Sequence, residues 1–407
     1  MESSSANPEG QKNESPTRLK SKTLFSKSVD PRAMSNLWAA QWRDMNRAMW
    51  GGWGAGQTKQ VAGGESRSLL AQTLSTGLTR SARLFMPDSA GPGAPLVVML
   101  HGCMQDSESF ARLTRMDQIA REQGFNVLYP DQDSSANRMQ CWNWFAPENQ
   151  ARLGGEPEAL ATIVEQAQDI CQAKPRHTWL AGISAGAALA SSMAQLYPEL
   201  FGAVALVAGP MPFSAKDVNG ALEAMKSGTG TELLSEMRAK ATRAGERRQQ
   251  GDARVLPVLI VQGQADQTVN PAHAGWQEQS ALLLNDALND GRLDGAIQTL
   301  SESRSPGGET RVWRGAHQEV LAITVRPRDL GHAWSGGDPA EPFSQAGFDQ
   351  SRLALEFFKA AACGDWSKFE APVLAERLWG VRAGKENGAH AQPYLGVPKR
   401  SKLAPRA

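Results

Sequence analysis

Residues 178–197 read TWLAGISAGAALASSMAQLY, the segment with the clearest structural signal in the chain. An apolar run of strand length leads into Gly182-Ile183-Ser184-Ala185-Gly186, and small residues of helical character follow. A serine between a strand and a helix is typical of a nucleophile elbow, where the flanking glycines let both elements approach closely. The context predicts Ser184 as a nucleophile, and the alternative is a glycine-rich turn with a capping serine.

Apolar runs of strand length recur on both sides of this segment. They are Ala82–Met86, Leu96–Leu100, Asn126–Tyr129, Ala203–Ala208 and Val258–Val261. Helical patterns such as Glu158–Ala173 lie between them. Near-continuous apolar strands are typical of a parallel sheet covered on both faces, and strand–helix alternation is typical of doubly wound α/β folds. The sequence therefore predicts an α/β fold with a mostly parallel sheet and helices on both faces.

A serine nucleophile needs a general base and an acid that orients the base. Behind an elbow of this kind the three residues follow in the order Ser, Asp, His. Asp266 comes after the buried run Val258–Val261, and His332 lies in a glycine-bounded loop after the run Val320–Val325. We therefore predict Asp266 as the acid and His332 as the base.

Other readings of these positions are weaker. His317 precedes the run Val320–Val325, so it should lie at the opposite end of that strand. Asp329 competes with Asp266, but it lies very near His332 in the sequence. Asp266 as a helix cap and His332 as a capping loop histidine remain the structural alternatives.

An oxyanion hole needs backbone N–H groups that point at the developing charge. One should come from Ala185, the residue after the nucleophile. The other should come from the turn after the early strand Leu96–Leu100, which places the Cys103 amide there. We predict that His101 supports this turn rather than acting as a second base.

Composition excludes several classes of protein. The 407 residues carry a net charge of +1, so no global field attracts nucleic acid. The four cysteines form no C-x-x-C pair, and we find no H-E-x-x-H or Walker pattern. We expect no metal, no organic cofactor and no nucleic-acid partner. No apolar stretch approaches the roughly 18 residues of a membrane helix.

The chain divides into three predicted parts. Residues 1–65 form a polar N-terminal segment with a Trp-rich amphipathic helix at 36–50, which either docks on the catalytic domain or touches an apolar surface such as a polymer granule. Residues 66–365 form the catalytic domain, with 211–253 as a lid insertion or a solvated surface helix. Residues 366–407 form a polar tail. Because the N-terminus lacks an apolar signal region, we expect a cytoplasmic protein, with association to a granule or secretion as the alternatives.

Four motifs in matching order resemble the PHB depolymerase family of esterases, of the α/β-hydrolase superfamily. They are Leu-His-Gly-Cys-x-Gln at 100–105, Cys-Trp-Asn-Trp-Phe at 141–145, Gly-Ile-Ser-Ala-Gly at 182–186 and Gly-His-Ala-Trp-Ser-Gly-Gly at 331–337. The resemblance covers residues 66–365 and implies an α/β-hydrolase fold with Ser184, Asp266 and His332 as the triad. It also implies that Cys103 and Cys141 are neighbours, with a disulfide as one alternative.

The substrate is where the sequence leaves alternatives open. Trp142, Trp144 and Trp334 cluster in these motifs, and aromatic walls suit an apolar acyl chain or a sugar face, so we predict them as substrate-binding residues, with core packing as the alternative. The leading substrate is a short-chain hydroxyalkanoate ester, such as polyhydroxybutyrate or its oligomers. The alternatives are a feruloyl or acetyl carbohydrate esterase and a non-catalytic granule-associated protein on a hydrolase scaffold.

Overall fold

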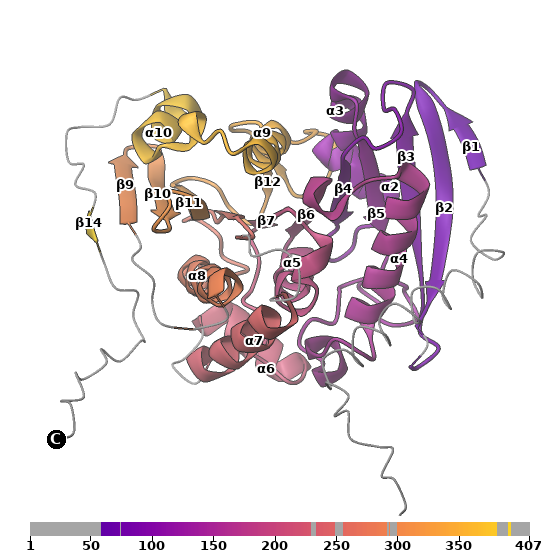
Figure 1. Cartoon of the computed structure of the whole chain (residues 1–407), viewed down its shortest axis with the longest axis horizontal. Coiled ribbons are helices and arrows are strands. Elements are labelled where there is room, and N and C mark those ends of the chain that lie inside the picture. The colour runs from indigo at the N-terminus through magenta and orange to yellow at the C-terminus, as the bar shows by residue number, and fades with distance from the viewer. Residues whose placement is uncertain are drawn as a thin grey trace, which may run out of the picture. The chain divides into compact units, whose positions relative to one another are not determined.

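The apolar runs of the sequence form the centre of a 12-stranded sheet in the computed structural model (Figure 1). The structure describes residues 58–73, 75–228, 233–248, 255–290, 293, 299–380 and 390–391. The helix predicted at 36–50 lies outside these residues. Along the sheet the strand order is β1-β2-β3-β5-β4-β6-β7-β8-β11-β10-β9-β14.

The strands of this sheet include the seven predicted runs and five strands that were not predicted. They are β1 (Thr58–Val61), β2 (Gly64–Gln72), β3 (Thr79–Pro87), β4 (Leu96–Leu100), β5 (Asn126–Pro130), β6 (Thr178–Ile183), β7 (Ala203–Val207), β8 (Val258–Val261), β9 (Thr299–Ser305), β10 (Gly308–Arg314), β11 (Val320–Pro327) and β14 (His390–Ala391). The strands from β5 to β11 in the sheet order run parallel, whereas the strands outside them pair antiparallel. A separate parallel pair joins β12 (Trp334–Ser335) to β13 (Ser344–Gln345).

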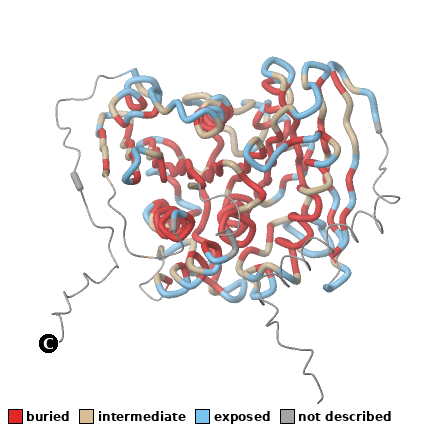
Figure 2. The backbone as a smooth tube through the Cα atoms, viewed as in Figure 1, coloured by how far each residue is buried: buried red, intermediate tan, exposed pale blue. Residues whose placement is uncertain are grey.

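Helices cover both faces of the sheet. They are α2 (Ser107–Thr114), α3 (Met116–Gln123), α4 (Glu156–Cys171), α5 (Ala185–Leu196), α6 (Val218–Ser227), α7 (Leu233–Arg248), α8 (His273–Asp290), α9 (Gln350–Cys363) and α10 (Ala371–Trp379), with the 3-10 turns η1 (Pro147–Gln150), η2 (Pro175–His177), η3 (Pro198–Leu200) and η4 (Ser367–Phe369). One core layer packs α4, α5, α7 and α8 against the sheet, and the other packs α2, α3, α9 and α10. Figure 2 shows the central strands buried between these layers. The predicted α/β fold class is confirmed.

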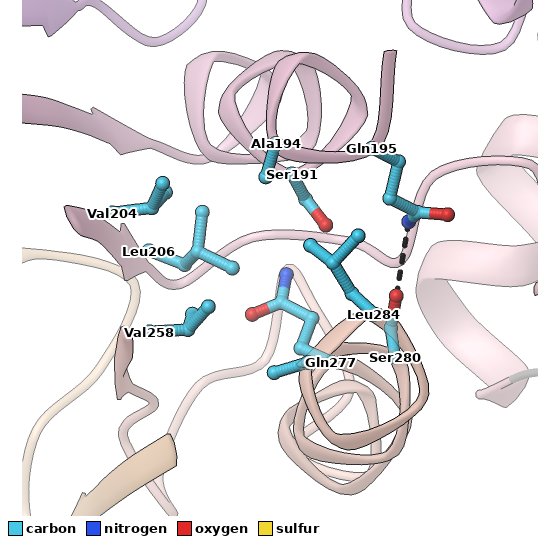
Figure 3. A pocket seen from close by; sticks show the side chains of 10 residues that line it. Ser191, Ala194, Gln195, Val204, Leu206, Val258, Gln277, Ser280 and Leu284 are labelled. Atoms are coloured by element: carbon cyan, nitrogen blue, oxygen red, sulfur yellow. Dashed lines mark hydrogen bonds between the residues drawn. The ribbon is translucent and has the colours of Figure 1, made fainter. Parts of the chain in front are cut away.

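The centre of the sheet is apolar on both faces because helices cover both. Every residue of β4, β5, β6, β7 and β8 is buried, as expected of parallel strands between two helical layers. Figure 3 shows a small interior space between α5 and α8, where Gln195 donates a hydrogen bond to Ser280 over 2.9 Å. It has room for about one water molecule, so it is a packing defect rather than a substrate site.

The boundaries of the folded region differ from the predicted ones. Two strands, β1 and β2, begin before residue 66. At the other end, η4 and α10 belong to the packed core rather than to a polar tail, because Phe369 and Leu374 are buried against β10 and α9. The apolar residues of this helix are few and lie among charged residues, so the sequence did not indicate a packed helix here.

The predicted insertion at 211–253 contains α6 and α7. Helix α7 buries Leu233, Met237, Ala241 and Ala244 against α5 and α8, although its other face is charged. A lid role for the insertion stays a prediction. Among the described helices, none combines the length and the apolar character needed to cross a bilayer.

Candidate active site

The elbow around Ser184 is built by close contact between backbone segments. Ser184 joins β6 to α5 with φ 55° and ψ −124°, a strained conformation for a residue with a side chain. A Cβ on Gly186 would lie 2.3 Å from the Leu100 carbonyl oxygen, and one on Gly182 would lie 2.4 Å from the Gly186 oxygen. Only glycine fits at these two positions, which holds the serine at the C-terminal edge of the sheet.

Ser184, His332 and Asp266 come together in one hydrogen-bonded chain. The Nε2 atom of His332 lies 3.0 Å from the Ser184 hydroxyl oxygen, and Nδ1 lies 2.9 Å from Oδ2 of Asp266. The carboxylate of Asp266 is fully buried, whereas the imidazole is 13% exposed. With Nδ1–H donating to the carboxylate, Nε2 is free to accept the serine proton.

The Asp266 carboxylate is fixed by its own loop. Oδ1 accepts the amides of Thr268 and Val269, each over 2.9 Å, and Oδ2 also accepts Nε2 of Gln262 over 2.9 Å. Burial acts to raise the pKa of Asp266, but the hydrogen bond and charge of His332 and the two amides outweigh it and hold the pKa below its usual value. The acid is therefore ionised at neutral pH.

The acid loop and the base loop pack against each other. The amide of Ala265 donates to the Leu330 carbonyl over 3.1 Å, and a Cβ on Gly263 would lie 1.9 Å from that same oxygen. The amide of Gly331 donates to Oε1 of Gln345 over 2.9 Å. These contacts fix Leu330 and Gly331, the two residues directly before His332.

The turn after β4, residues His101–Gln105, lies against Ser184 and is called here the oxyanion loop after its predicted role. A Cβ on Gly102 would be 3.5 Å from the Ser184 Cβ. The Gly102 amide donates to Oε1 of Gln105 over 2.9 Å, and Cys103 forms a disulfide with Cys141. Ala185 is the first residue of α5, where a helix has N–H groups without partners in the helix.

His101 supports this loop from the interior. Its side chain is 1% exposed, Nδ1 lies 2.7 Å from the Gly102 carbonyl oxygen, and Nε2 accepts the Gln132 amide over 3.1 Å. Burial lowers the pKa of His101, so the ring is neutral at pH 7. The contacts agree with a supporting role and leave no nitrogen for a second base.

The three tryptophans predicted to bind substrate are packed in the core instead. Trp142, Trp144 and Trp334 are 1%, 3% and 0% exposed. Trp142 donates Nε1–H to the His101 carbonyl over 3.1 Å, and Trp334 donates to the Ser351 hydroxyl over 3.0 Å. Rings so enclosed have no face for a substrate, so we do not propose them as substrate-binding residues.

His317, the alternative candidate for the base, lies away from Ser184. The backbone amide of His317 bonds to Glu319 in the turn before β11, at the far end of that strand.

Gln262 was not predicted from the sequence, although its position directly after β8 places it just before the loop that carries Asp266. A polar residue at the end of a buried strand is a usable signal for such a supporting contact.

A family model described as Esterase PHB depolymerase matches residues 80–309, more than half of the chain. The chain belongs to the PHB depolymerase family of esterases. His332 lies beyond the matched residues, so its assignment depends on the geometry above.

Individual proteins similar to this chain include a depolymerase and a carbohydrate esterase. Over 258 residues the chain is 28% identical to Poly(3-hydroxyalkanoate) depolymerase C of Paucimonas lemoignei, covering 63% of this chain and 58% of that protein. It is 28% identical over 130 residues to Acetylxylan esterase A of Talaromyces purpureogenus, covering 31% of this chain and 32% of the relative. The chain thus spans less than two thirds of the length of these relatives.

A solved structure supports the fold. The acetyl xylan esterase from Aspergillus awamori matches 72% of this chain and 98% of its own, with a TM-score of 0.53 and 17% identity. At that identity the match shows the shared fold alone.

Proposed function

We propose that the chain is a serine esterase in which Ser184 is the nucleophile, His332 the general base and Asp266 the orienting acid. The observation that carries the proposal is the continuous chain of hydrogen bonds from the Ser184 hydroxyl through His332 to Asp266, at 3.0 and 2.9 Å. Nucleophile, base and orienting group within hydrogen-bond reach are the signature of an activated serine.

The geometry supports a two-step acyl transfer. The Ser184 oxygen attacks the ester carbonyl while Nε2 of His332 takes the serine proton, and the amides of Cys103 and Ala185 stabilise the oxyanion. The imidazolium then gives its proton to the leaving alcohol as the tetrahedral intermediate collapses. Water then attacks the acyl-enzyme while Nε2 of His332 takes its proton, and return of this proton to the Ser184 oxygen releases the acid. Apart from the ester and water, these steps use side chains and backbone amides of the chain.

For the substrate we propose short-chain hydroxyalkanoate esters, as a polymer or as its oligomers. The relative with the longest match among those described, from Paucimonas lemoignei, is a poly(3-hydroxyalkanoate) depolymerase. A feruloyl or acetyl carbohydrate esterase is the second candidate, because Acetylxylan esterase A and Feruloyl esterase B are also relatives. Contact with a polymer granule through residues 36–50 stays a prediction outside the described residues.

The location of the protein bears on this choice. The bond between Cys103 and Cys141 is of a kind found mainly in proteins of oxidising compartments. It therefore weighs against the predicted cytoplasmic location.

A substrate panel tests the proposal. We expect the purified full chain to hydrolyse p-nitrophenyl butyrate and 3-hydroxybutyrate trimers, and Ser184→Ala to lose both activities by several orders of magnitude, roughly 10⁴-fold or more. Faster hydrolysis of methyl ferulate or acetylated xylan than of the trimer would favour the second candidate. A wild-type protein inactive on every ester would contradict the esterase proposal.

A further inference from the structure

A polar cluster at the first turn of α4 is formed by Glu156 together with Arg80, Gln132 and the half-buried Asn143. Glu156 is 2% exposed, and Arg80 and Gln132 are 5% and 1% exposed. A buried carboxylate needs several partners to offset the loss of water. The proposed reaction uses none of these side chains, so their arrangement needs another reason.

The carboxylate of Glu156 is the centre of the cluster. Oε1 accepts Nε2 of Gln132 over 2.5 Å, Nδ2 of Asn143 over 3.1 Å and Nη2 of Arg80 over 3.3 Å. Oε2 accepts the Asn143 backbone amide over 2.9 Å. Burial raises the pKa of Glu156, and these donors offset that effect only in part.

Two links run from this cluster to the oxyanion loop, and both pass through Gln132. Its backbone amide donates to Nε2 of His101 over 3.1 Å. Its side-chain amide, besides contacting Glu156, donates to the Cys141 carbonyl over 2.9 Å, and Cys141 is bridged to Cys103. The cluster therefore holds Cys103 from two sides, through the neighbouring histidine and through the disulfide.

The contact with His101 also sets the direction of the Cys103 amide. Because Nε2 accepts a hydrogen bond, the ring proton is on Nδ1, which donates to the Gly102 carbonyl over 2.7 Å. No cis peptide bond occurs among the described residues, and in a trans peptide the C=O and the following N–H point in opposite directions. Fixing the Gly102 carbonyl inward turns the Cys103 N–H outward, away from the imidazole.

We infer that Glu156, acting through Gln132, is a positioning residue that aims the Cys103 amide at the oxyanion. The inference depends on the proposed function, since it assumes that Cys103 is an oxyanion donor. A misaimed donor weakens binding of the transition state and leaves binding of the ground-state ester nearly unchanged, because the charge appears only as the reaction proceeds.

A second buried carboxylate provides a matched control. Glu278 in α8 is 5% exposed, accepts Nη1 of Arg311 over 2.7 Å and accepts the Thr324 hydroxyl over 2.7 Å. It thus resembles Glu156 in burial and in its arginine partner. It packs against β10 and β11, and none of its described contacts involves the oxyanion loop.

The experiment compares Glu156→Gln with Glu278→Gln in the full chain, with p-nitrophenyl butyrate as substrate and active sites counted by titration. We expect kcat to fall roughly 10- to 100-fold in Glu156→Gln with KM within about threefold of wild type. Inhibition by a trifluoromethyl ketone, which mimics the oxyanion, should weaken by a similar factor. Glu278→Gln should keep the wild-type kcat, even if both variants melt at lower temperature.

A milder variant keeps the test decisive if Glu156→Gln does not fold. Gln132→Asn shortens the side chain and withdraws its amide from both Glu156 and Cys141, and it carries the same expectation. Wild-type kcat in a folded variant of either kind, or an equal loss in Glu278→Gln, would overturn the positioning role. An inactive wild-type protein would instead contradict the proposed function, so the two failures are distinct.

Discussion

The Asp266 carboxylate accepts several hydrogen bonds besides the one from the imidazole of His332. Gln262, Thr268 and Val269 hold the carboxylate in place, and His332 is its remaining partner. The protein itself therefore fixes the orientation of this carboxylate. Such preorganisation favours the Nδ1–H tautomer of His332, which leaves Nε2 able to accept the serine proton.

Replacing this acid by its amide should disable the base. In Asp266→Asn the side-chain NH₂ can face Nδ1, which favours the wrong imidazole tautomer, and we expect kcat to fall on the order of 10³- to 10⁴-fold. Steady-state hydrolysis of p-nitrophenyl butyrate measures the loss. Asp329→Asn is the control, because Asp329 lies near His332 in sequence but outside the hydrogen-bonded chain. An equal loss in both variants would contradict the assignment.

Two buried histidines make stability depend on pH. Burial lowers the pKa of both His101 and His273. The folded protein then binds protons less readily than the unfolded chain, so acid favours unfolding. Below about pH 6.5 each histidine should cost about 1.4 kcal/mol of stability per pH unit, until its folded pKa is reached.

His273→Gln tests this dependence. Nδ1 of His273 accepts the Met211 amide over 3.0 Å, and Nε2 lies 2.8 Å from the Ala224 carbonyl oxygen. Glutamine can make both contacts without titrating. Urea unfolding between pH 7 and pH 5 should show a shallower loss of stability in the variant. Identical slopes in the two proteins would show that His273 does not contribute.

At the scale of elements, the elbow was predictable because its signal is local. A strand pattern, a glycine-serine-glycine turn and small helical residues are contiguous, so 178–197 alone indicated β6 and α5. The order of the motifs then indicated the acid and the base. Glu156 was not predictable in this way, because its partners Arg80 and Gln132 are far apart in sequence and only folding brings them together.

The contact between α5 and β4 gives a prediction at this scale. In Gly186→Ala the new Cβ would meet the carbonyl oxygens of Leu100 and His101 at 2.3 and 2.4 Å. Helix α5 must then move from the sheet, so we expect a loss of roughly 1–3 kcal/mol in stability together with reduced kcat. Thermal unfolding and ester hydrolysis measure the two effects.

Gly275→Ala is the matched control. Gly275 lies in α8, and a Cβ there would have no neighbour within 4 Å. Alanine favours a helix over glycine by up to about 1 kcal/mol, so stability should rise slightly and activity should not change. Equal behaviour of the two variants would mean that the α5–β4 contact is looser than described.

At the scale of the whole molecule, the sheet extends beyond what the sequence indicated. The parallel centre was predicted from its apolar runs, but β1, β2, β9 and β10 have polar faces and did not stand out. Partial exposure explains this, since antiparallel strands can face water on one side and then carry polar residues there. The three tryptophans were misassigned because aromatic content does not reveal whether a ring faces solvent or core.

Residues 366–379, which contain η4 and α10, give the prediction at the scale of the whole molecule. Phe369 is 1% exposed and contacts the rings of Phe357 and Trp366. We expect Phe369→Ala to lose about 3–5 kcal/mol of stability while the folded fraction keeps its kcat. Val373→Ala, at a 41% exposed position of α10, should change stability by no more than about 0.5 kcal/mol. Urea unfolding of both variants measures the difference, and equal stabilities would contradict the packed role of residues 366–379.

The central claim is that His332 and Asp266 activate Ser184, and covalent labelling tests it most directly. A fluorophosphonate reacts with an activated serine, and mass spectrometry of the digested protein locates the adduct. We predict one adduct, on the peptide carrying Ser184, which forms much more slowly in His332→Ala and is absent in Ser184→Ala. A label on another serine, or unchanged labelling of Ser184 in His332→Ala, would contradict it.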